Sequence, residues 1–118
     1  MNLEALHERI RSSTDFSRVG MIASHRGVVR GTSRDGLPVA SFHVKMNTER
    51  LSDIIESARK RPGIVEVLVE YQEGELLPGE DVLLVAVAGD LRDNVFPALV
   101  DTVDEIKRFA TESWERYA

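Results

Sequence analysis

The chain has 118 residues, of which 42% are hydrophobic and 30% are charged, a composition typical of one globular domain with its own core. It contains no cysteine, which excludes disulfide bonds, thiolate zinc sites, iron–sulfur clusters and a cysteine nucleophile. The net charge of -5 offers no general attraction for nucleic acid, so an anionic ligand needs a local cluster of arginine and lysine. The chain does not begin like a secretion signal, and no apolar run approaches the roughly 18 residues of a membrane span. We therefore expect a cytoplasmic protein that does not bind membranes.

Hydrophobic periodicity and turn residues divide the chain into alternating helices and strands. Helix caps are expected at Asn2 and at Asn47 or Thr48, and Gly27 is a candidate β-bulge. In chain order, the pattern predicts a helix over 2–12, one bent strand or two short strands over 18–30, a loop over 31–36, a strand over 39–46, a helix over 48–61, strands over 64–71 and 82–88 joined by a turn at 73–80, and a long helix from Asp93 to Tyr117.

The strand predicted at 82–88 is apolar on both of its faces. Such a strand is expected in the centre of a sheet, covered on one side by helices and on the other side by a further element or a second subunit. Neither a linker nor an internal repeat interrupts the chain. The sequence therefore predicts a single α+β domain over residues 1–118.

Lys107 is the most informative charged residue of the last predicted helix. On a helical wheel it falls inside an apolar arc of roughly 140°, between Trp114 and Val100. One interpretation is that its aliphatic stem lies along the core while its ammonium reaches water. The other is a lysine at the rim of a pocket, where desolvation lowers its pKa and suits it to act as a base, an acid or a nucleophile.

Two arginines lie where strands end. Arg92 is at a junction between a strand and a helix, where helix N-termini receive anions, although pairing with Asp90 or Asp93 on the surface explains it equally well. Arg30 ends the first predicted strand beside a loop that carries Arg34, and its alternative is a solvated edge residue.

Metal and nucleotide motifs are missing from the sequence. His7, His25 and His43 have no short metal-ligand spacing, so no metal site is expected. The glycines form neither a dinucleotide-binding fingerprint nor a phosphate-binding loop, so no cofactor is expected.

The order of several motifs resembles the large, catalytic subunit of molybdopterin synthase over about residues 18–115. The most specific part is the segment Gly74-Glu75-Leu76-Leu77-Pro78-Gly79-Glu80, followed by the apolar strand, Arg92 and a lysine 15 residues later. Gly27-Val28-Val29-Arg30, the helix at 48–61 and Trp114 complete the pattern.

This resemblance implies an α+β fold of the α/β hammerhead type, with an antiparallel or mixed sheet and a long C-terminal helix, that forms a homodimer. It implies transfer of sulfur from the C-terminal Gly-Gly thiocarboxylate of a small ubiquitin-like subunit to cyclic pyranopterin monophosphate, within a heterotetramer that makes molybdopterin for the molybdenum cofactor. By the same resemblance, Lys107 is the active-site lysine, and Arg30 and Arg92 bind the anionic substrate or the tail of the partner.

The chain departs from the family pattern at two positions. Leu91 replaces the usual histidine before Arg92, and Glu115 replaces the usual second lysine after Trp114. Arg116 follows directly and is a candidate to compensate for the missing lysine. These departures leave a second hypothesis open, namely a noncatalytic relative that acts as a binding or scaffold module, and a third, an interaction domain outside the family.

Overall fold

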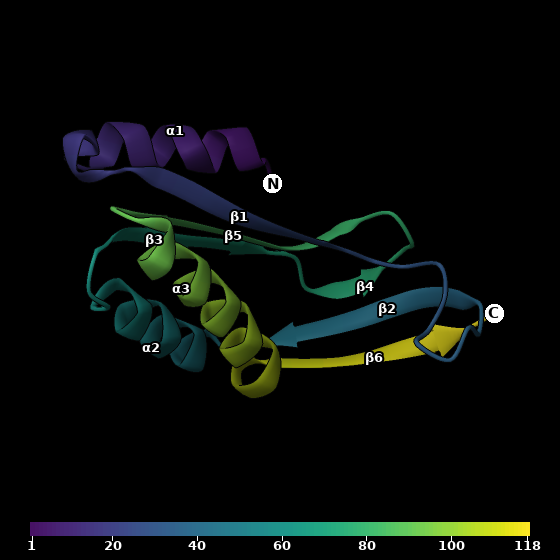
Figure 1. Cartoon of the computed structure of the whole chain (residues 1–118). Coiled ribbons are helices and arrows are strands. Elements are labelled where there is room, and N and C mark those ends of the chain that lie inside the picture. Colours follow the sequence, from purple (N-terminus) through teal and green to yellow (C-terminus); the bar gives the residue numbers. More distant parts are fainter.

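The computed structural model describes all residues from 1 to 118. The chain forms two three-stranded antiparallel sheets and three α-helices (Figure 1). None of the helices combines the length and apolar character needed to cross a lipid bilayer. In chain order the elements are α1 (Leu3–Ser13), the 3₁₀ turn η1 (Phe16–Arg18), β1 (Met21–Val28), β2 (Val39–Met46), α2 (Thr48–Arg59), β3 (Ile64–Tyr71), β4 (Gly74–Leu76), β5 (Asp81–Gly89), α3 (Arg92–Glu105), the π-helical turn η2 (Ile106–Ala110) and β6 (Thr111–Tyr117).

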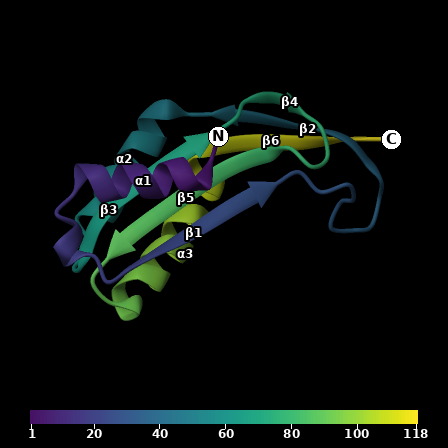
Figure 2. The same ribbon diagram turned by 90° about the horizontal axis from the view of Figure 1, so that it is seen from above.

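The larger sheet has the strand order β1-β5-β3, so the strand that is apolar on both faces is central, as predicted. Helix α1 covers one face of this sheet, and α2 and α3 cover the other (Figure 1, Figure 2). On the α1 side, Leu84 and Ala86 belong to a buried cluster with Leu6 and Ile10. The second cover of β5 is therefore a helix of the same chain, so burial of this strand does not require a second subunit.

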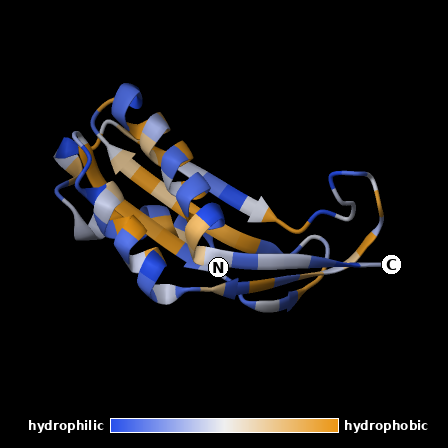
Figure 3. Ribbon diagram, turned by 90° about the horizontal axis from the view of Figure 1, so that it is seen from below, coloured by the Kyte–Doolittle hydropathy of each residue, from blue (hydrophilic) through white to orange (hydrophobic).

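The other face of β5 carries the main core. Val85 and Val87 are fully buried in one cluster with Val95, Ala98 and Ile106, which come from α3 and η2. Figure 3 shows hydrophobic residues along the strands of this sheet and hydrophilic residues on the outer turns of the helices. This distribution is the one expected for a sheet buried between two helical layers.

The smaller sheet has the order β4-β2-β6 and extends away from the helices along the length of the molecule (Figure 1). Its core is a cluster of three buried residues, Val29, Val44 and Leu76. Strand β4 lies inside the segment predicted only as a turn, where Leu76 is buried and pairs with Phe42 of β2. Turn-forming glycine and proline on both sides of this short strand hide it in the sequence.

The helix predicted from Asp93 to Tyr117 is correct only in its first part. Helix α3 ends at Glu105, η2 continues to Ala110, and the remaining residues form β6. Residues 103, 106, 110 and 114 have helical spacing, but Trp114 lies opposite His43 in the ladder between β6 and β2. Tertiary pairing with β2 thus overrides a local pattern that fits a helix equally well.

The predicted helix caps and the predicted β-bulge in β1 are confirmed. The side chains of Asn2 and Asn47 accept hydrogen bonds from the backbone N–H groups of Ala5 and Arg50, at 3.2 and 3.0 Å, and so cap α1 and α2. The register of β1 against β5 shifts after Gly27, as expected for a bulge. These features follow from the residues themselves, because they depend on neighbours within a few positions.

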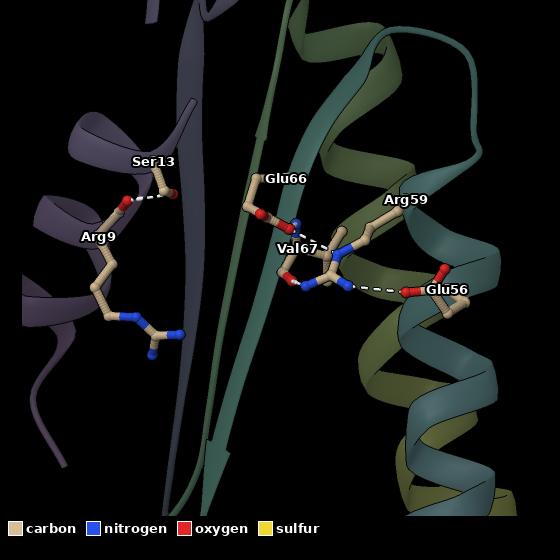
Figure 4. Close-up of polar contacts among 6 residues, drawn as sticks. All are labelled: Arg9, Ser13, Glu56, Arg59, Glu66 and Val67. Carbon is tan, nitrogen blue, oxygen red and sulfur yellow. Dashed lines mark hydrogen bonds and ion pairs between the residues drawn. The ribbon is translucent and has the colours of Figure 1, made fainter. Parts of the chain in front are cut away.

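Arg59 attaches the end of α2 to the larger sheet (Figure 4). Its Nε donates to Glu66 Oε1 of β3 at 2.7 Å, and its Nη1 donates to Glu56 at 2.9 Å. On the other side of the sheet, the Ser13 hydroxyl donates to the carbonyl of Arg9 and closes the last turn of α1 (Figure 4). Arg59 thus fixes one end of α2 to the sheet, and at the other end of this helix Arg50 donates to the carbonyl of Phe109 in η2 at 3.0 Å.

Candidate functional site

A cavity of about 630 Å³ lies between the ends of the two sheets. Its walls come from β2 and β6, the adjoining ends of β1 and β5, η2, and the loop that follows β1. Three cationic and two anionic side chains line it, which gives the cavity a formal charge of +1 although the chain as a whole carries -5. The charged lining residues are Arg30, Arg34, Lys107, Asp35 and Glu115.

Lys107 lies on the cavity wall in the π-helical turn η2 and is exposed to solvent. Single π turns are rare and occur often at functional sites. Donors from outside the turn bind its carbonyl groups at both ends: the Thr111 hydroxyl donates to the first one at 3.0 Å, and the Arg50 guanidinium and the Asn47 backbone N–H donate to the last two at 3.0 and 2.7 Å. The turn that carries the lysine is therefore held from α2 and β6, and its ammonium is accessible to a ligand in the cavity.

His25 was not singled out as a site residue by the sequence. Its Nε2 is buried without a hydrogen-bond partner and lies close over Gly27, which lines the cavity. Burial lowers the pKa of His25 below its ordinary value of 6.5, and the positive charge of Lys107 lowers it further. Burial and the nearby Lys107 thus both disfavour the charged form of His25. No group of three or more potential metal ligands is present.

Arg30 also lines the cavity, and part of its guanidinium organises the adjoining loop. Its Nε donates to the carbonyl of Thr32 at 3.2 Å, and its Nη2 donates to the carbonyl of Ser33 at 2.9 Å. Ser33 is buried and its hydroxyl accepts the backbone N–H of Leu37 at 3.1 Å. Arg30 therefore holds the loop that forms one side of the cavity, and its remaining N–H groups are available to an anion.

Arg92 does not lie with these residues. It is exposed in the first turn of α3, whereas Lys107 follows the last turn, so the two are separated by about 20 Å along the helix axis. Asp90, its neighbour at this end, accepts hydrogen bonds from the Leu91 backbone N–H at 2.6 Å and from Asn94 at 2.8 Å. Within one chain, the structure brings together Lys107 and Arg30 but not Arg92.

Strand β6 separates the two residues that follow Trp114. Glu115 is half-buried in the cavity lining, because alternate residues of the strand face this side. Arg116 faces the other side, where it donates to the Ser41 hydroxyl and to Glu75, each at 3.1 Å. Trp114 stacks on His43 with ring centroids 5.1 Å apart. Arg116 is therefore engaged outside the cavity, and the cavity holds a carboxylate where the resemblance leads us to expect a lysine.

Comparison with known proteins gives concordant matches to this chain. It is 31% identical over 94 residues to the molybdopterin synthase catalytic subunit of Ralstonia nicotianae, an alignment that covers 76% of this chain and 53% of the relative. The chain spans about half the length of the first curated relatives that it matches.

Solved structures share the fold. The molybdopterin biosynthesis MoaE protein from Burkholderia ambifaria superposes with a TM-score of 0.79 at 24% identity, covering 100% of this chain and 82% of that one. A chain in the protein–protein complex of subunits 1 and 2 of molybdopterin-converting factor from Helicobacter pylori superposes with a TM-score of 0.73 at 15% identity, covering 99% and 80%. The model of the family described as MoaE protein matches residues 1–109, nearly the whole chain. This chain therefore belongs to the MoaE protein family.

Proposed function

We propose that this chain is the catalytic subunit of a cytoplasmic molybdopterin synthase. In this reaction, sulfur passes from the C-terminal thiocarboxylate of a small ubiquitin-like subunit to cyclic pyranopterin monophosphate. The observation that carries the proposal is that Lys107 and Arg30 share one cavity in a chain of the MoaE family. The similarity to catalytic subunits of molybdopterin synthase supports the same reaction.

The charges of the cavity suit both reactants. A phosphate and a thiocarboxylate are anionic, and Arg30, Arg34 and Lys107 supply positive charge locally in an acidic chain. When sulfur leaves the thiocarboxylate carbon, an oxygen from water replaces it, so the tail ends as a carboxylate. Lys107 serves this exchange either as general acid and base or by holding the acyl carbon on its amine until water releases it.

The proposed partner inserts its extended Gly-Gly tail toward Lys107. Residues without side chains fit a narrow channel between strand ends and a helix, and glycine adopts the backbone conformations that such a path requires. The complex of two different subunits in Helicobacter pylori molybdopterin-converting factor supports an assembly with a second protein. The tail is thus proposed to enter the cavity beside η2.

The proposal also includes a homodimer. Arg92 is about 20 Å from Lys107 along α3, too far to serve the same cavity within one chain. A second copy that presents its own Arg92 to this cavity would reconcile the role proposed for this arginine with its position. Two large and two small subunits would then form the heterotetramer.

Single-turnover formation of the dithiolene tests the proposed activity. The assay combines the thiocarboxylated small subunit, cyclic pyranopterin monophosphate and this chain. We expect Lys107→Ala to abolish sulfur transfer with little loss of stability, because the side chain is exposed. Lys60→Ala, at an exposed lysine after α2, is the matched control and should retain the wild-type rate.

A partner that lacks the terminal Gly-Gly should bind far more weakly.

A noncatalytic binding module is the second candidate function. Glu115 and the outward position of Arg116 favour it, because the cavity holds a carboxylate where the resemblance implies a second lysine, and Leu91 replaces the histidine expected beside Arg92. This alternative predicts a wild-type protein that binds the small subunit but forms no dithiolene. A wild type that turns over, with full rate retained in Lys107→Ala, would instead contradict the role assigned to the lysine.

A further inference from the structure

Glu115 is a carboxylate without a cationic partner in the wall of the cavity. It is half-buried, and its hydrogen-bond contact is with the Tyr117 hydroxyl at 3.4 Å. None of the ion pairs of the molecule includes it, although Lys107 and Arg30 line the same cavity. The adjacent Arg116 is directed to the other face of β6, where it pairs with Glu75.

The position of Glu115 along β6 separates it from the lysine. Glu115 is four residues beyond Thr111, which adjoins η2, and this corresponds to about 13 Å along an extended strand. The carboxylate and the ammonium therefore serve different parts of the cavity. A ligand that fills the cavity meets Lys107 near η2, net positive charge at the loop after β1, where Asp35 offsets one of the two arginines, and an acceptor of hydrogen bonds on β6.

An unpaired carboxylate in a cavity wall favours ligand groups that donate hydrogen bonds. It would repel a phosphate or thiocarboxylate placed against it, and it has two oxygens that accept hydrogen bonds. Carboxylates bind most strongly to two parallel N–H donors on one rigid edge, as in pairs with arginine. The pyrimidinone ring of a pterin presents such an edge through its 2-amino group and its N3–H.

We propose that Glu115 binds the aminopyrimidinone edge of the pterin substrate, with one carboxylate oxygen accepting from the 2-amino group and the other from N3–H. The phosphate end of the substrate then lies toward Arg30 and Lys107. This inference rests on the proposed function and makes Glu115 a specificity-determining residue of the same cavity. It also assigns a binding function to the glutamate that this chain has where the family pattern has a lysine.

Binding of two matched ligands tests this assignment without the partner or turnover. The ligands are 6-hydroxymethylpterin monophosphate and the corresponding lumazine, in which oxygen replaces the 2-amino group. We expect the wild type to prefer the pterin, and Glu115→Gln to weaken pterin binding about tenfold or more while lumazine binding changes little. Calorimetry gives the dissociation constants, and circular dichroism with thermal melting verifies that the variant is folded.

Glu112→Gln is the matched control, because Glu112 is an exposed acid on the same strand at a position that faces away from the cavity. Binding of both ligands should be unchanged in this variant. If Glu115→Gln tightens both ligands equally, Glu115 only reduces the positive charge of the cavity and the assignment is overturned. Equal affinity of the wild type for the pterin and the lumazine also overturns it.

The test of Glu115 can succeed or fail independently of the proposed enzymatic activity. A wild type that selects the pterin through Glu115 but forms no dithiolene supports this inference and contradicts the enzymatic proposal. A wild type that transfers sulfur normally, with a Glu115→Gln variant that binds the pterin as tightly, supports the enzyme and rejects the role of Glu115.

Discussion

His25 and Lys107 place two ionisable groups close together at the cavity. The pKa of His25 is lowered first by burial and then by the charge of the lysine. We therefore expect Lys107→Met to raise the pKa of His25 toward its ordinary value of 6.5 without reaching it, since burial remains. An NMR titration of the imidazole measures this change, and Lys60→Met should leave the titration unchanged. An unaltered His25 pKa in Lys107→Met would show that the two groups do not interact.

The lowered pKa has a defined effect on stability. As the pH falls through 6.5, the unfolded chain takes up a proton on His25 before the folded chain does, so the free energy of unfolding decreases. The contribution of His25 to the free energy of unfolding is thus fully present above pH 6.5, and it is lost as the pH falls through the lower pKa of the folded state. Replacing His25 by leucine should remove this part of the pH dependence in denaturant titrations.

Some helices and strands of the chain are predictable from their own residues, and others are not. Helix α2 follows from its apolar spacing and from the Asn47 cap, and the central place of β5 follows from its two apolar faces. Strand β6 was not predictable, because its residues have no alternating pattern and acquire their conformation by pairing with β2. Lys107 is predicted as a site residue from its charge in an apolar segment, and it lies in the cavity wall, but the cavity around it depends on that same pairing.

Helix α1 provides a direct test of how the outer face of β5 is covered. Leu6 is fully buried against Leu84 and Ala86, so Leu6→Ala should lower the free energy of unfolding by about 3 kcal/mol. Urea denaturation followed by circular dichroism measures this change. Glu8→Ala, on the exposed side of the same helix, should change stability by less than about 0.5 kcal/mol. A small effect of Leu6→Ala would mean that α1 does not form this cover.

At the scale of the whole molecule, the separation of Arg92 from Lys107 makes the proposed homodimer testable by complementation. Arg92→Ala and Lys107→Ala should each be inactive or strongly impaired alone. After the two variants are mixed and allowed to exchange subunits, half of the dimers are mixed and each restores one of its two sites, giving about a quarter of wild-type activity. Sedimentation verifies the dimer. No recovery from exchanged dimers would mean that Arg92 does not serve the cavity of another copy.

The two sheets that enclose the cavity have cores of very different size. The larger sheet is buried in clusters of 14 and 6 residues, whereas the core of the smaller sheet has three. Regions with few buried contacts open locally at a lower free energy than the whole domain unfolds. Strands β2, β4 and β6 are thus expected to exchange their amide hydrogens through sub-global opening while the larger sheet stays closed. A ligand that contacts both sheets across the cavity would couple their opening. Because binding would also have to suppress the opening of the smaller sheet, the measured affinity would be lower than the affinity for the closed state.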